Sequence, residues 1–309
     1  MIVVTGGDGF IGKNLVDRLR LLKDESVISL DTKTESLEFI YSWLSTNARA
    51  IDGIYHLGAI TDTTEMNVAK FDEYNLNMSI FIWNLCSNFE IPLVYASSAA
   101  TYGDGNLGFD DEMDISNLQP LNPYGWSKQQ FDLFTEKENN IELFYPPFWA
   151  GLKFFNVYGY GEDHKGNMAS MVFHSFNQVI NHEEIKLFKS HKSDYKDGEQ
   201  LRDFIYVDDV VDVCIYMMEE KPARGIYNVG TGKSRSFNDL ASAVFKSLNT
   251  EKNITYFDTP LNLREQYQYF TQATTNKLRN IGYNKSFTEL EDGVDRYCKQ
   301  LLQRKLGLD

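Results

Sequence analysis

A serine, a tyrosine and a lysine between residues 97 and 128 have the types and spacing needed for acid–base chemistry on an alcohol. Tyr124 and Lys128 are four residues apart, so on a helix they lie on one face. A phenol has a reference pKa of about 10, and an ammonium group one turn away favours its deprotonated form. With Ser98 before them, these groups are suited to removing a hydroxyl proton while the same carbon loses hydride. The spacing also fits an ordinary amphipathic helix that begins after Asn122-Pro123.

A leaving hydride needs an acceptor, and the N-terminal residues have the pattern of a dinucleotide site. A β-rich run leads into the segment GGDGFIG, residues 6–12, and then into a helical pattern. Its first, third and last glycine positions (6, 9 and 12) permit a tight turn, close approach of the backbone to a pyrophosphate, and close helix packing. A second strand ends in Asp31, which can bind the ribose hydroxyls. The alternative is a glycine-rich turn without a ligand.

The composition excludes several classes of protein. The 309 residues are 42% hydrophobic and 24% charged, as in soluble globular chains, and the formal charge is −14. That charge argues against nucleic acid or an anionic membrane as the main partner, although an anionic small molecule can bind where basic residues converge. No apolar run approaches the roughly 18 residues of a membrane span and no leader precedes IVVTGG, so we expect a cytoplasmic protein. The three cysteines are far apart and indicate neither a disulfide framework nor a metal site.

The order of the expected elements predicts an α/β fold, a Rossmann-type doubly wound parallel sheet with a smaller, interleaved C-terminal substrate domain. Only one helix fits between Asp31 and the third strand. The fourth strand is expected to deliver Ser97 and Ser98 at its carboxyl end, where ligands collect in such sheets. The expected helices are about 35–44 and 71–88, and the expected strands are 2–5, 27–30, 53–57, 91–96 and 151–157, the last ending at Asn156.

We expect the second half of the chain to be less regular. The expected elements are a helix at 168–181, a polar surface segment at 189–200, a strand leading into a helix at 202–210, a strand at 226–229, and mixed helix and loop after about residue 234. The polar cluster at 263–267 is the part of this last region most suited to meet a ligand. We assign residues 1–160 and about 203–230 to a dinucleotide-binding domain, and about 161–202 and 231–309 to a substrate domain.

Five motifs, in this order, resemble the extended short-chain dehydrogenase/reductase family, the NAD-dependent epimerases and dehydratases, which act on nucleotide sugars. They are GxxGxxG near the N-terminus, SSAATYG, YGWSK, FNVYG and RDFIYVDDV. A narrower resemblance, to the members that invert C6 of an ADP-linked heptose, is carried by TDTTE, YASSAATYG, FNVYGYGEDHKGNMASMVFH and YQYFTQA. The HKGxMAS and TQA stretches are not general features of the larger family. Together the similarity covers nearly the whole chain.

The resemblance implies an isomerase that works by a hydride shuttle. A bound nicotinamide would take hydride from C6 and leave a transient ketone, and the sugar would turn over and receive the hydride on its other face. Because the hydroxyl lies on opposite sides in substrate and product, two proton-transfer groups are needed, by similarity Tyr124 and Lys165. Ser98 would hydrogen bond the reacting oxygen, and Lys128 would hold the ribose. Lys165, by spacing alone an ordinary surface lysine, would need a lowered pKa to act as a base.

The resemblance and the local patterns together give the candidate ligand contacts. Arg202 and Arg264 are the candidates for the diphosphate, because a guanidinium binds it bidentately; the alternative is ion pairing with Asp203 or Glu265. The cofactor candidates are Gly6, Gly9, Phe10, Ile11, Gly12, Asp31, Lys33, His56, Gly58, Ala59, Asn75, Tyr124 and Lys128. The substrate candidates are Thr63, Ser98, Asn156, His174, Arg202, Arg264 and Tyr267. Structural roles fit His56, Asn75 and His174 as well.

Two departures from the family pattern bear on the cofactor. The segment between Asp31 and His56 is shorter than usual and lacks a strand ending in an acid that touches adenine. Members of this type often use NADP, with lysines after the second strand, but only Lys33 is close here, and Asp31 would repel a 2′-phosphate. We expect one tightly bound NADP or NAD per subunit, NADP by resemblance and NAD by the local residues.

Other functions fit parts of the pattern. A nucleotide-sugar 4-epimerase or 4,6-dehydratase would share the fold, but the dehydratases carry Thr-Asp-Glu near the position of Ser98, where this chain has Ser98-Ala99-Ala100-Thr101. A protein that binds the dinucleotide without turnover would be expected to have lost Tyr124 or Lys128, and both are present. By resemblance to other sugar-nucleotide enzymes, we expect a homo-oligomer.

Overall fold

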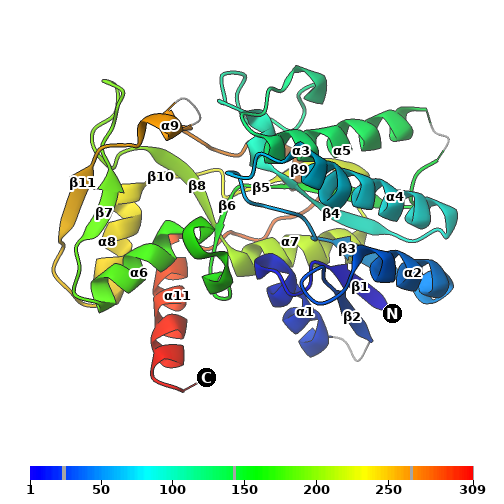
Figure 1. Ribbon diagram of the computed structural model, residues 1–309, viewed down its shortest axis with the longest axis horizontal. Coiled ribbons are helices and arrows are strands. Elements are labelled where there is room, and N and C mark those ends of the chain that lie inside the picture. The colour runs from blue at the N-terminus through cyan, green and yellow to red at the C-terminus, as the bar shows by residue number, and fades with distance from the viewer. Residues whose placement is uncertain (23–25, 142–143, 265–266, 309) are drawn as a thin grey trace. The chain divides into compact units, whose positions relative to one another are not determined.

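The computed structural model of the chain contains two compact units that alternate along the sequence. The structure describes residues 1–22, 26–141, 144–264 and 267–308. Unit 1 comprises Met1–Phe154, Val210–Val229 and Thr274–Asn284, and unit 2 comprises Phe155–Asp209, Gly230–Ala273 and Lys285–Asp309. Figure 1 labels the helices and strands of both units.

Unit 1 is built on a six-stranded parallel sheet in the order β2-β1-β3-β4-β5-β9. Its strands are β1 (Ile2–Thr5), β2 (Val27–Leu30), β3 (Gly53–His56), β4 (Leu93–Ser98), β5 (Trp149–Phe154) and β9 (Gly225–Val229). Nearly all their residues are buried, as in parallel strands covered on both faces. The strand order reverses between β1 and β3, so their carboxyl ends bound the crevice where such sheets bind ligands. The expected doubly wound α/β sheet is confirmed.

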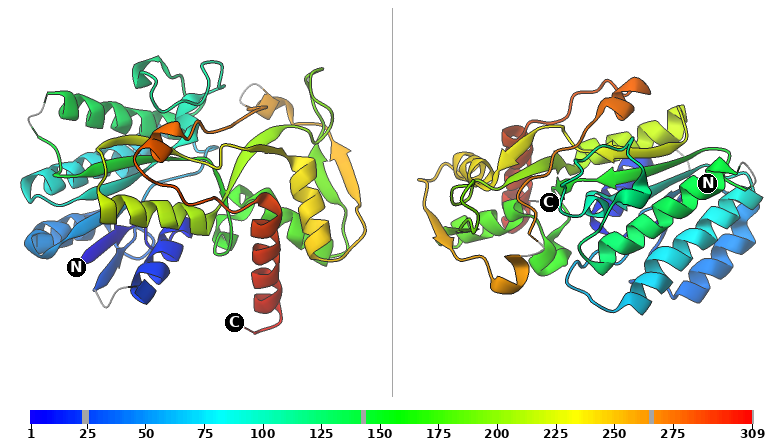
Figure 2. Two further views of the ribbon diagram at one scale, coloured as in Figure 1. Left: turned by 180° about the vertical axis from the view of Figure 1, so that it is seen from behind. Right: turned by 90° about the horizontal axis from the view of Figure 1, so that it is seen from above.

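Helices cover both faces of this sheet (Figure 2). On one face lie α2 (Leu37–Asn47), α4 (Met78–Asn88) and α5 (Pro123–Asn140), and on the other lie α1 (Phe10–Leu22) and α7 (Val207–Glu220). An ion pair of 3.1 Å joins Arg18 of α1 to Asp212 of α7. A short helix, α10 (Asn276–Asn280), also belongs to this unit. Only α2 and a short 3-10 helix (Ala48–Ala50) lie between β2 and β3, so the described residues after Asp31 form no additional strand, as expected from the length of this segment.

Two strand boundaries differ from those expected, and both bear on the site. β4 extends to Ser98, because Ser97 and Ser98 pair in register with Lys153 and Phe154 of β5. The two serines therefore lie inside the strand rather than after it. The run expected as one strand at 151–157 is divided, because β5 pairs with β4 and β9 whereas the next residues, β6 (Asn156–Tyr158), pair with a strand of unit 2.

The long helix expected at 71–88 is a compound element. It begins with α3 (Val68–Phe71), capped by the side chain of Asn67, widens into a π-helical turn over Asp72–Asn77, and continues as α4. A π-helical turn inserts one residue into the helical repeat and occurs often at functional sites. Here the turn contains the buried Asn75.

Unit 2 has two small sheets with helices packed on them. One sheet has the order β10-β8-β6 and the other pairs β11 with β7. The remaining elements are β7 (Ile185–Phe188), β8 (Leu201–Tyr206), β10 (Ser234–Ser236), β11 (Ile254–Phe257), α6 (Met171–Ile180), α8 (Phe237–Ser247), α9 (Leu261–Arg264) and α11 (Leu290–Lys305). The strands β10 and β11 correct the expectation of helix and loop alone after about residue 234; each is too short to show a clear apolar alternation. The capping box at Ser236 and Asp239 starts α8.

The described residues contain no helix that is both long enough and apolar enough to cross a membrane. Within the same ranges, no group of three or more histidine, cysteine or acidic side chains could hold a metal ion. Cys86, Cys214 and Cys298 are buried free thiols, each inside a helix.

Candidate active site

The start of α5 places the tyrosine and the lysine of the YxxxK pair. Asn122 caps the helix by accepting a hydrogen bond from the main chain of Gly125 at 2.8 Å, and Pro123 occupies the first turn, where its missing N–H costs nothing. The cap fixes the helix start at Pro123, one residue before Tyr124. Tyr124 and Lys128 therefore share one helical face, as the spacing predicts.

Lys128 is buried and reaches the neighbouring strand. Its Nζ donates a hydrogen bond to the main-chain oxygen of Ala96 in β4, 2.8 Å away. Burial lowers the pKa of Lys128 to about 8, and the negative charge of Asp132 opposes that shift. The group can thus lose its proton near neutral pH, which an exposed lysine does not do.

Ser98 ends β4 next to Tyr124. Its Oγ accepts a hydrogen bond from the main chain of Ala100 at 3.1 Å, and its main-chain oxygen accepts one from Thr101 Oγ1 at 2.8 Å. Burial raises the pKa of Tyr124, and a hydrogen bond with the Ser98 side chain lowers it. The charge of Asp132 adds to the rise, so the protein alone does not lower the pKa of this phenol as the sequence spacing predicts. A nearby cation on the ligand side would shift the balance toward the phenolate.

The glycine segment between β1 and α1 has the close packing that a dinucleotide cradle requires. Gly6 has φ +72°, and a Cβ built on it would lie 2.5 Å from the main chain of Gly58. A Cβ on Gly12 would collide with the main-chain oxygen of Gly6. Phe10, which is buried, and the partly exposed Ile11 begin α1. The backbone can therefore approach a pyrophosphate at the helix N-terminus, as the sequence predicts.

Asp31 lies where the second strand ends, as expected. It is 5% exposed, and its two carboxylate oxygens accept hydrogen bonds from the main chains of Asp8 at 3.0 Å and Lys33 at 2.9 Å. Lys33 directs its Nζ to the main-chain oxygen of Asp8 at 3.1 Å. Each carboxylate oxygen keeps a lone pair that can accept a ribose hydroxyl. The arrangement links Asp31 and Lys33 to the glycine segment.

The side chain of His56 is engaged within the core of unit 1. Its ring nitrogens hydrogen bond Thr5 Oγ1 at 2.7 Å and Ser79 Oγ at 2.8 Å, and the side chain is 2% exposed. Burial lowers its pKa to about 3, and Lys128 adds to the shift. His56 is a neutral core group that joins β1, β3 and α4, in line with the structural role also considered for it.

Asn75 acts on the loop that contains Gly58 and Ala59. Its amide exchanges two hydrogen bonds with the main chain of Ile60, at 2.8 and 3.0 Å, and donates a third to Ser127 Oγ at 2.9 Å. Ser127 in turn donates to the main-chain oxygen of Tyr124 at 2.7 Å. Asn75 therefore ties the loop after β3 to the first turns of α5. The sequence did not point to Ser127, because a serine between Tyr124 and Lys128 has no distinctive spacing.

Lys165 belongs to unit 2, in a 3-10 segment over Asp163–Met168. Burial lowers its pKa, and the nearby Glu162 opposes that shift. Glu162 is fully buried and accepts hydrogen bonds from the main chain and the hydroxyl of Ser170 at 2.6 and 2.5 Å. The lowered pKa is the property that a proton-transfer lysine requires. Glu162 was not identified from the sequence, because one acid in a charge-rich loop carries no signal.

Arg202 is 7% exposed and lies against two aromatic rings of unit 2. Its guanidinium carbon is 5.2 Å from the Tyr267 ring centre and 5.7 Å from that of Phe237, and Nη1 donates to the oxygen of Leu201 at 2.9 Å. Asp203 directs its carboxylate to other donors, the main chains of Thr231, Gly232 and Ala273 and the Thr231 hydroxyl. The alternative of an Arg202–Asp203 ion pair is therefore wrong, because adjacent strand residues point to opposite faces.

The remaining substrate candidates are distributed over both units. Thr63 lies in a turn after β3, in unit 1. In unit 2, Asn156 accepts a hydrogen bond from Thr271 Oγ1 at 3.3 Å, His174 is half-buried on α6, and Arg264 donates from Nε to the oxygen of Thr259 at 2.9 Å. Glu265 and Gln266, part of the expected polar cluster, lie outside the described residues.

The chain is similar to known proteins over nearly its whole length. Residues 2–230 match the model of the NAD dependent epimerase/dehydratase family. An ADP-L-glycero-D-manno-heptose-6-epimerase of Fusobacterium nucleatum is 42% identical over 99% of each chain. The crystal structure of the enzyme of the same name from Helicobacter pylori is 28% identical with a TM-score of 0.79, covering 97% of this chain and 96% of that one. A UDP-glucose 4-epimerase of Thermotoga maritima, 21% identical with a TM-score of 0.81 over 98% and 99% of the two chains, shares the fold.

Proposed function

The chain belongs to the NAD dependent epimerase/dehydratase family, and on that premise we propose that it inverts C6 of an ADP-linked glycero-manno-heptose. The observation that carries the proposal is the grouping of Ser98, Tyr124 and Lys128 at the carboxyl end of β4 and the start of α5. Support for the sugar comes from the 42% identical relative, which is named as a 6-epimerase and is matched over 99% of its length. Unit 1 binds the dinucleotide and unit 2 contributes the groups that recognise the sugar nucleotide.

The residues of unit 1 fit a nicotinamide dinucleotide. Glycines 6 and 12 leave no room for a side chain where the pyrophosphate would approach, and Asp31 offers carboxylate lone pairs to ribose hydroxyls. The dinucleotide, when bound, would supply the group that accepts the hydride from C6 and later gives it back to the same carbon. We assign NAD rather than NADP, because Asp31 would repel a 2′-phosphate and Lys33 is held by Asp8.

Ser98, Tyr124 and Lys128, at β4 and α5, would remove the proton of the C6 hydroxyl. Tyr124, as phenolate, accepts the proton of the C6 hydroxyl, and Ser98 donates a hydrogen bond to the oxygen that becomes a carbonyl. Lys128 holds a positive charge on the same helical face and so favours the phenolate. Its pKa, lowered to about 8, leaves this charge in place at neutral pH.

Inversion requires a second proton-transfer group for the opposite side of the sugar, and we assign it to Lys165. Support comes from the HKG segment, which resembles the 6-epimerases, and from burial, which lowers the pKa of this lysine. Arg202 is assigned to the diphosphate: a buried guanidinium whose hydrogen bond goes to a main-chain oxygen retains donors for an anionic ligand.

The direct test is stereochemical. Purified protein is incubated with ADP-D-glycero-β-D-manno-heptose, and the configuration at C6 is followed by NMR. Inversion at C6 is expected. If C6 keeps its configuration while C4 of another nucleotide sugar inverts, the assignment of the reaction is wrong.

A second test addresses Tyr124. Tyr124→Phe keeps the ring and its packing but removes the proton-transfer group, so we expect kcat to fall by about 10² to 10⁴-fold. The nicotinamide released on denaturation should be unchanged in amount. Activity close to that of the wild type would exclude the proposed role of Tyr124.

A further inference from the structure

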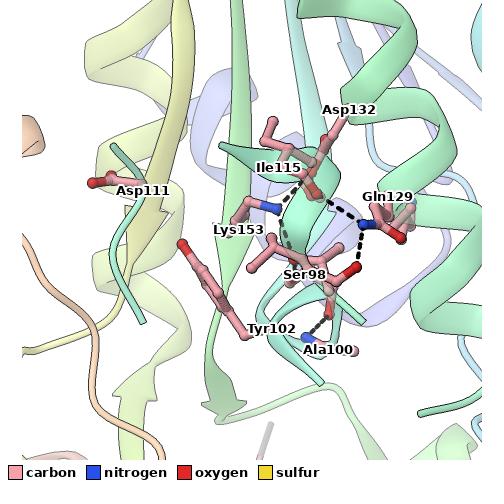
Figure 3. A network of polar contacts seen from close by, with 12 residues as sticks. Ser98, Ala100, Tyr102, Asp111, Ile115, Gln129, Asp132 and Lys153 are labelled. Carbon is pink, nitrogen blue, oxygen red and sulfur yellow. Dashed lines mark hydrogen bonds and ion pairs between the residues drawn. The ribbon is translucent and has the colours of Figure 1, made fainter. Parts of the chain in front are cut away.

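A fully buried ion pair lies next to the turn that carries Ser98. Lys153 Nζ is 2.7 Å from Asp132 Oδ2, and the two side chains are 2% and 0% exposed. Lys153 is on β5, beside Ser97 in the parallel register, and Asp132 is on α5. Figure 3 shows the lysine between Asp132 and the turn after Ser98. Because apolar residues of similar volume often stabilise a core as well as a buried ion pair does, stability alone does not account for it.

Asp132 collects hydrogen bonds from both strands. Its Oδ2 accepts from Ser97 Oγ at 2.7 Å as well as from Lys153, and its Oδ1 accepts from the Tyr95 hydroxyl at 3.0 Å. Tyr95 and Ser97 are two residues apart and so lie on one face of β4. These directional contacts fix α5 against β4 and β5 in one register, which apolar contacts at the same place would not do.

Lys153 also fixes the turn after Ser98. Its Nζ donates to Thr101 Oγ1 at 2.6 Å, and Thr101 Oγ1 donates to the main-chain oxygen of Ser98 at 2.8 Å. A continuous chain of contacts therefore runs from Asp132 through Lys153 and Thr101 to Ser98. Each member of this chain except Ser98 is at most 2% exposed, so water does not compete for the hydrogen bonds.

Asp132 lies on the same helical face as Tyr124 and Lys128, at intervals of four residues. An anchor at Asp132 therefore sets the rotation and height of the other two side chains against β4. We infer that Lys153 and Asp132 are positioning residues, which hold Ser98 on one side and Tyr124 and Lys128 on the other in reacting geometry. This inference rests on the proposed function, in which those three residues act on the C6 hydroxyl.

The test compares Lys153→Met, Lys153→Arg and the double variant Lys153→Met/Asp132→Asn with the wild type in the C6 inversion assay. The double variant leaves no buried charge unpaired, so it decides the question if Lys153→Met does not fold. A displacement of about 1 Å can lower a rate by about 100-fold. We expect kcat to fall by about 10- to 100-fold in both methionine variants with KM changed by less than about threefold. Lys153→Arg, which keeps the charge and the donors, should recover most of the loss.

Amide hydrogen exchange gives a readout that does not depend on activity. Exchange of peptides covering residues 96–102 should be faster in the methionine variants. The matched control is Arg18→Met, which breaks the ion pair with Asp212 in the same unit and should leave both kcat and this exchange unchanged.

Wild-type kcat and exchange in a folded methionine variant would overturn the inference, as would an equal loss of kcat in Arg18→Met. If the wild type itself does not invert C6, the proposed function fails, whereas the exchange comparison still decides whether the pair positions Ser98.

Discussion

Lys128 donates a hydrogen bond from its buried ammonium group to the main-chain oxygen of Ala96, 2.8 Å away. The contact ties the second turn of α5 to β4 and keeps the positive charge on the face that carries Tyr124. Burial lowers the pKa of this lysine, and the charge of Asp132, one turn further along the same face, opposes that shift. The charge state of Lys128 therefore depends on two opposing effects, burial and the negative charge of Asp132.

The pH dependence of kcat/KM should follow the loss of the positive charge on Lys128. Since the pKa of Lys128 is about 8, its charge is lost as the pH rises through that value, and kcat/KM should fall above about pH 8. Lys128→Arg keeps the charge at every accessible pH and should lose that alkaline limb, at a lower maximal rate because the guanidinium does not reproduce the contact with Ala96. Initial rates from pH 6 to 10 provide the comparison. An identical alkaline limb in the arginine variant would rule Lys128 out as its source.

Asn75 should contribute to stability far more than its neighbours in the π-helical turn. Asn75→Ala removes three hydrogen bonds and leaves both main-chain groups of Ile60 without them, so we expect the free energy of unfolding to fall by about 2 to 4 kcal/mol. Asn77→Ala, at an exposed position of the same turn, is the matched control and should change it by less than about 0.5 kcal/mol. Urea unfolding measures both. Equal effects would show that the clamp on Ile60 is energetically unimportant.

Because His56 is buried and neutral, we expect the free energy of unfolding to fall as the pH is lowered. Its pKa is about 3 in the folded chain against 6.5 for the ordinary group, so between these values the unfolded chain binds more protons. The stability that His56 provides is therefore complete above about pH 6.5 and falls as the pH is lowered. From pH 7 to pH 5 the loss is about 2 kcal/mol.

The variant His56→Gln isolates this effect, because glutamine can donate to and accept from Thr5 and Ser79 but does not titrate. Asp111, whose pKa burial raises to about 6, has the opposite pH dependence and is present in both proteins, so it cancels in the difference. The stability of the wild type relative to His56→Gln should drop by about 2 kcal/mol between pH 7 and pH 5. A constant difference would contradict the assignment of His56 as a neutral core group.

The sequence predicted the boundaries of helices and strands well where a local pattern marks them. It predicted them less well where the pairing of strands decides where a strand ends. The strand ending in Asp31 and the helix starting after Asn122 have clear local signals, and both are found. The division of the run at 151–157 depends on which strand pairs with which, and no short segment contains that information. The position of Ser98 inside β4 is likewise set by its pairing with Phe154.

The candidate site shows the same limit. Motif spacing identified Tyr124 and Lys128 because both lie on one helix, and the structure places them on one face. It could not identify Lys153 or Asp132 as groups that act on the site, because each does so through contacts with residues at least 21 positions away in sequence. It also left two roles open for His56, because the two hydrogen-bond partners of that side chain, Thr5 and Ser79, are remote in sequence.

Asp31 should control the choice between NAD and NADP. In the proposed dinucleotide site its carboxylate would face the 2′-phosphate of NADP, and a like charge a few ångströms away costs on the order of 1 to 4 kcal/mol. Asp31→Ala should therefore raise the affinity for NADP relative to NAD by at least about tenfold. Asp17→Asn, which removes one negative charge from an exposed position of α1, is the control and should leave the ratio unchanged. Titration calorimetry with both dinucleotides gives the ratio, and an unchanged ratio in Asp31→Ala would assign the preference to other residues.

Lys165 is the residue that distinguishes an inversion from a one-sided oxidation. Lys165→Met keeps an unbranched side chain that ends one atom short of the amine it removes, so the C6 hydroxyl should lose one of its two proton-transfer groups while Tyr124 remains. We expect kcat for inversion to fall by about 10² to 10⁴-fold, with KM changed little because the diphosphate contact assigned to Arg202 is intact. His164→Gln, at the preceding exposed position, is the matched control and should retain activity. Both rates come from the NMR assay at C6. If Lys165→Met inverts C6 at the rate of the control, a single group serves both sides of the sugar, and the sugar must present its hydroxyl to Tyr124 in both orientations.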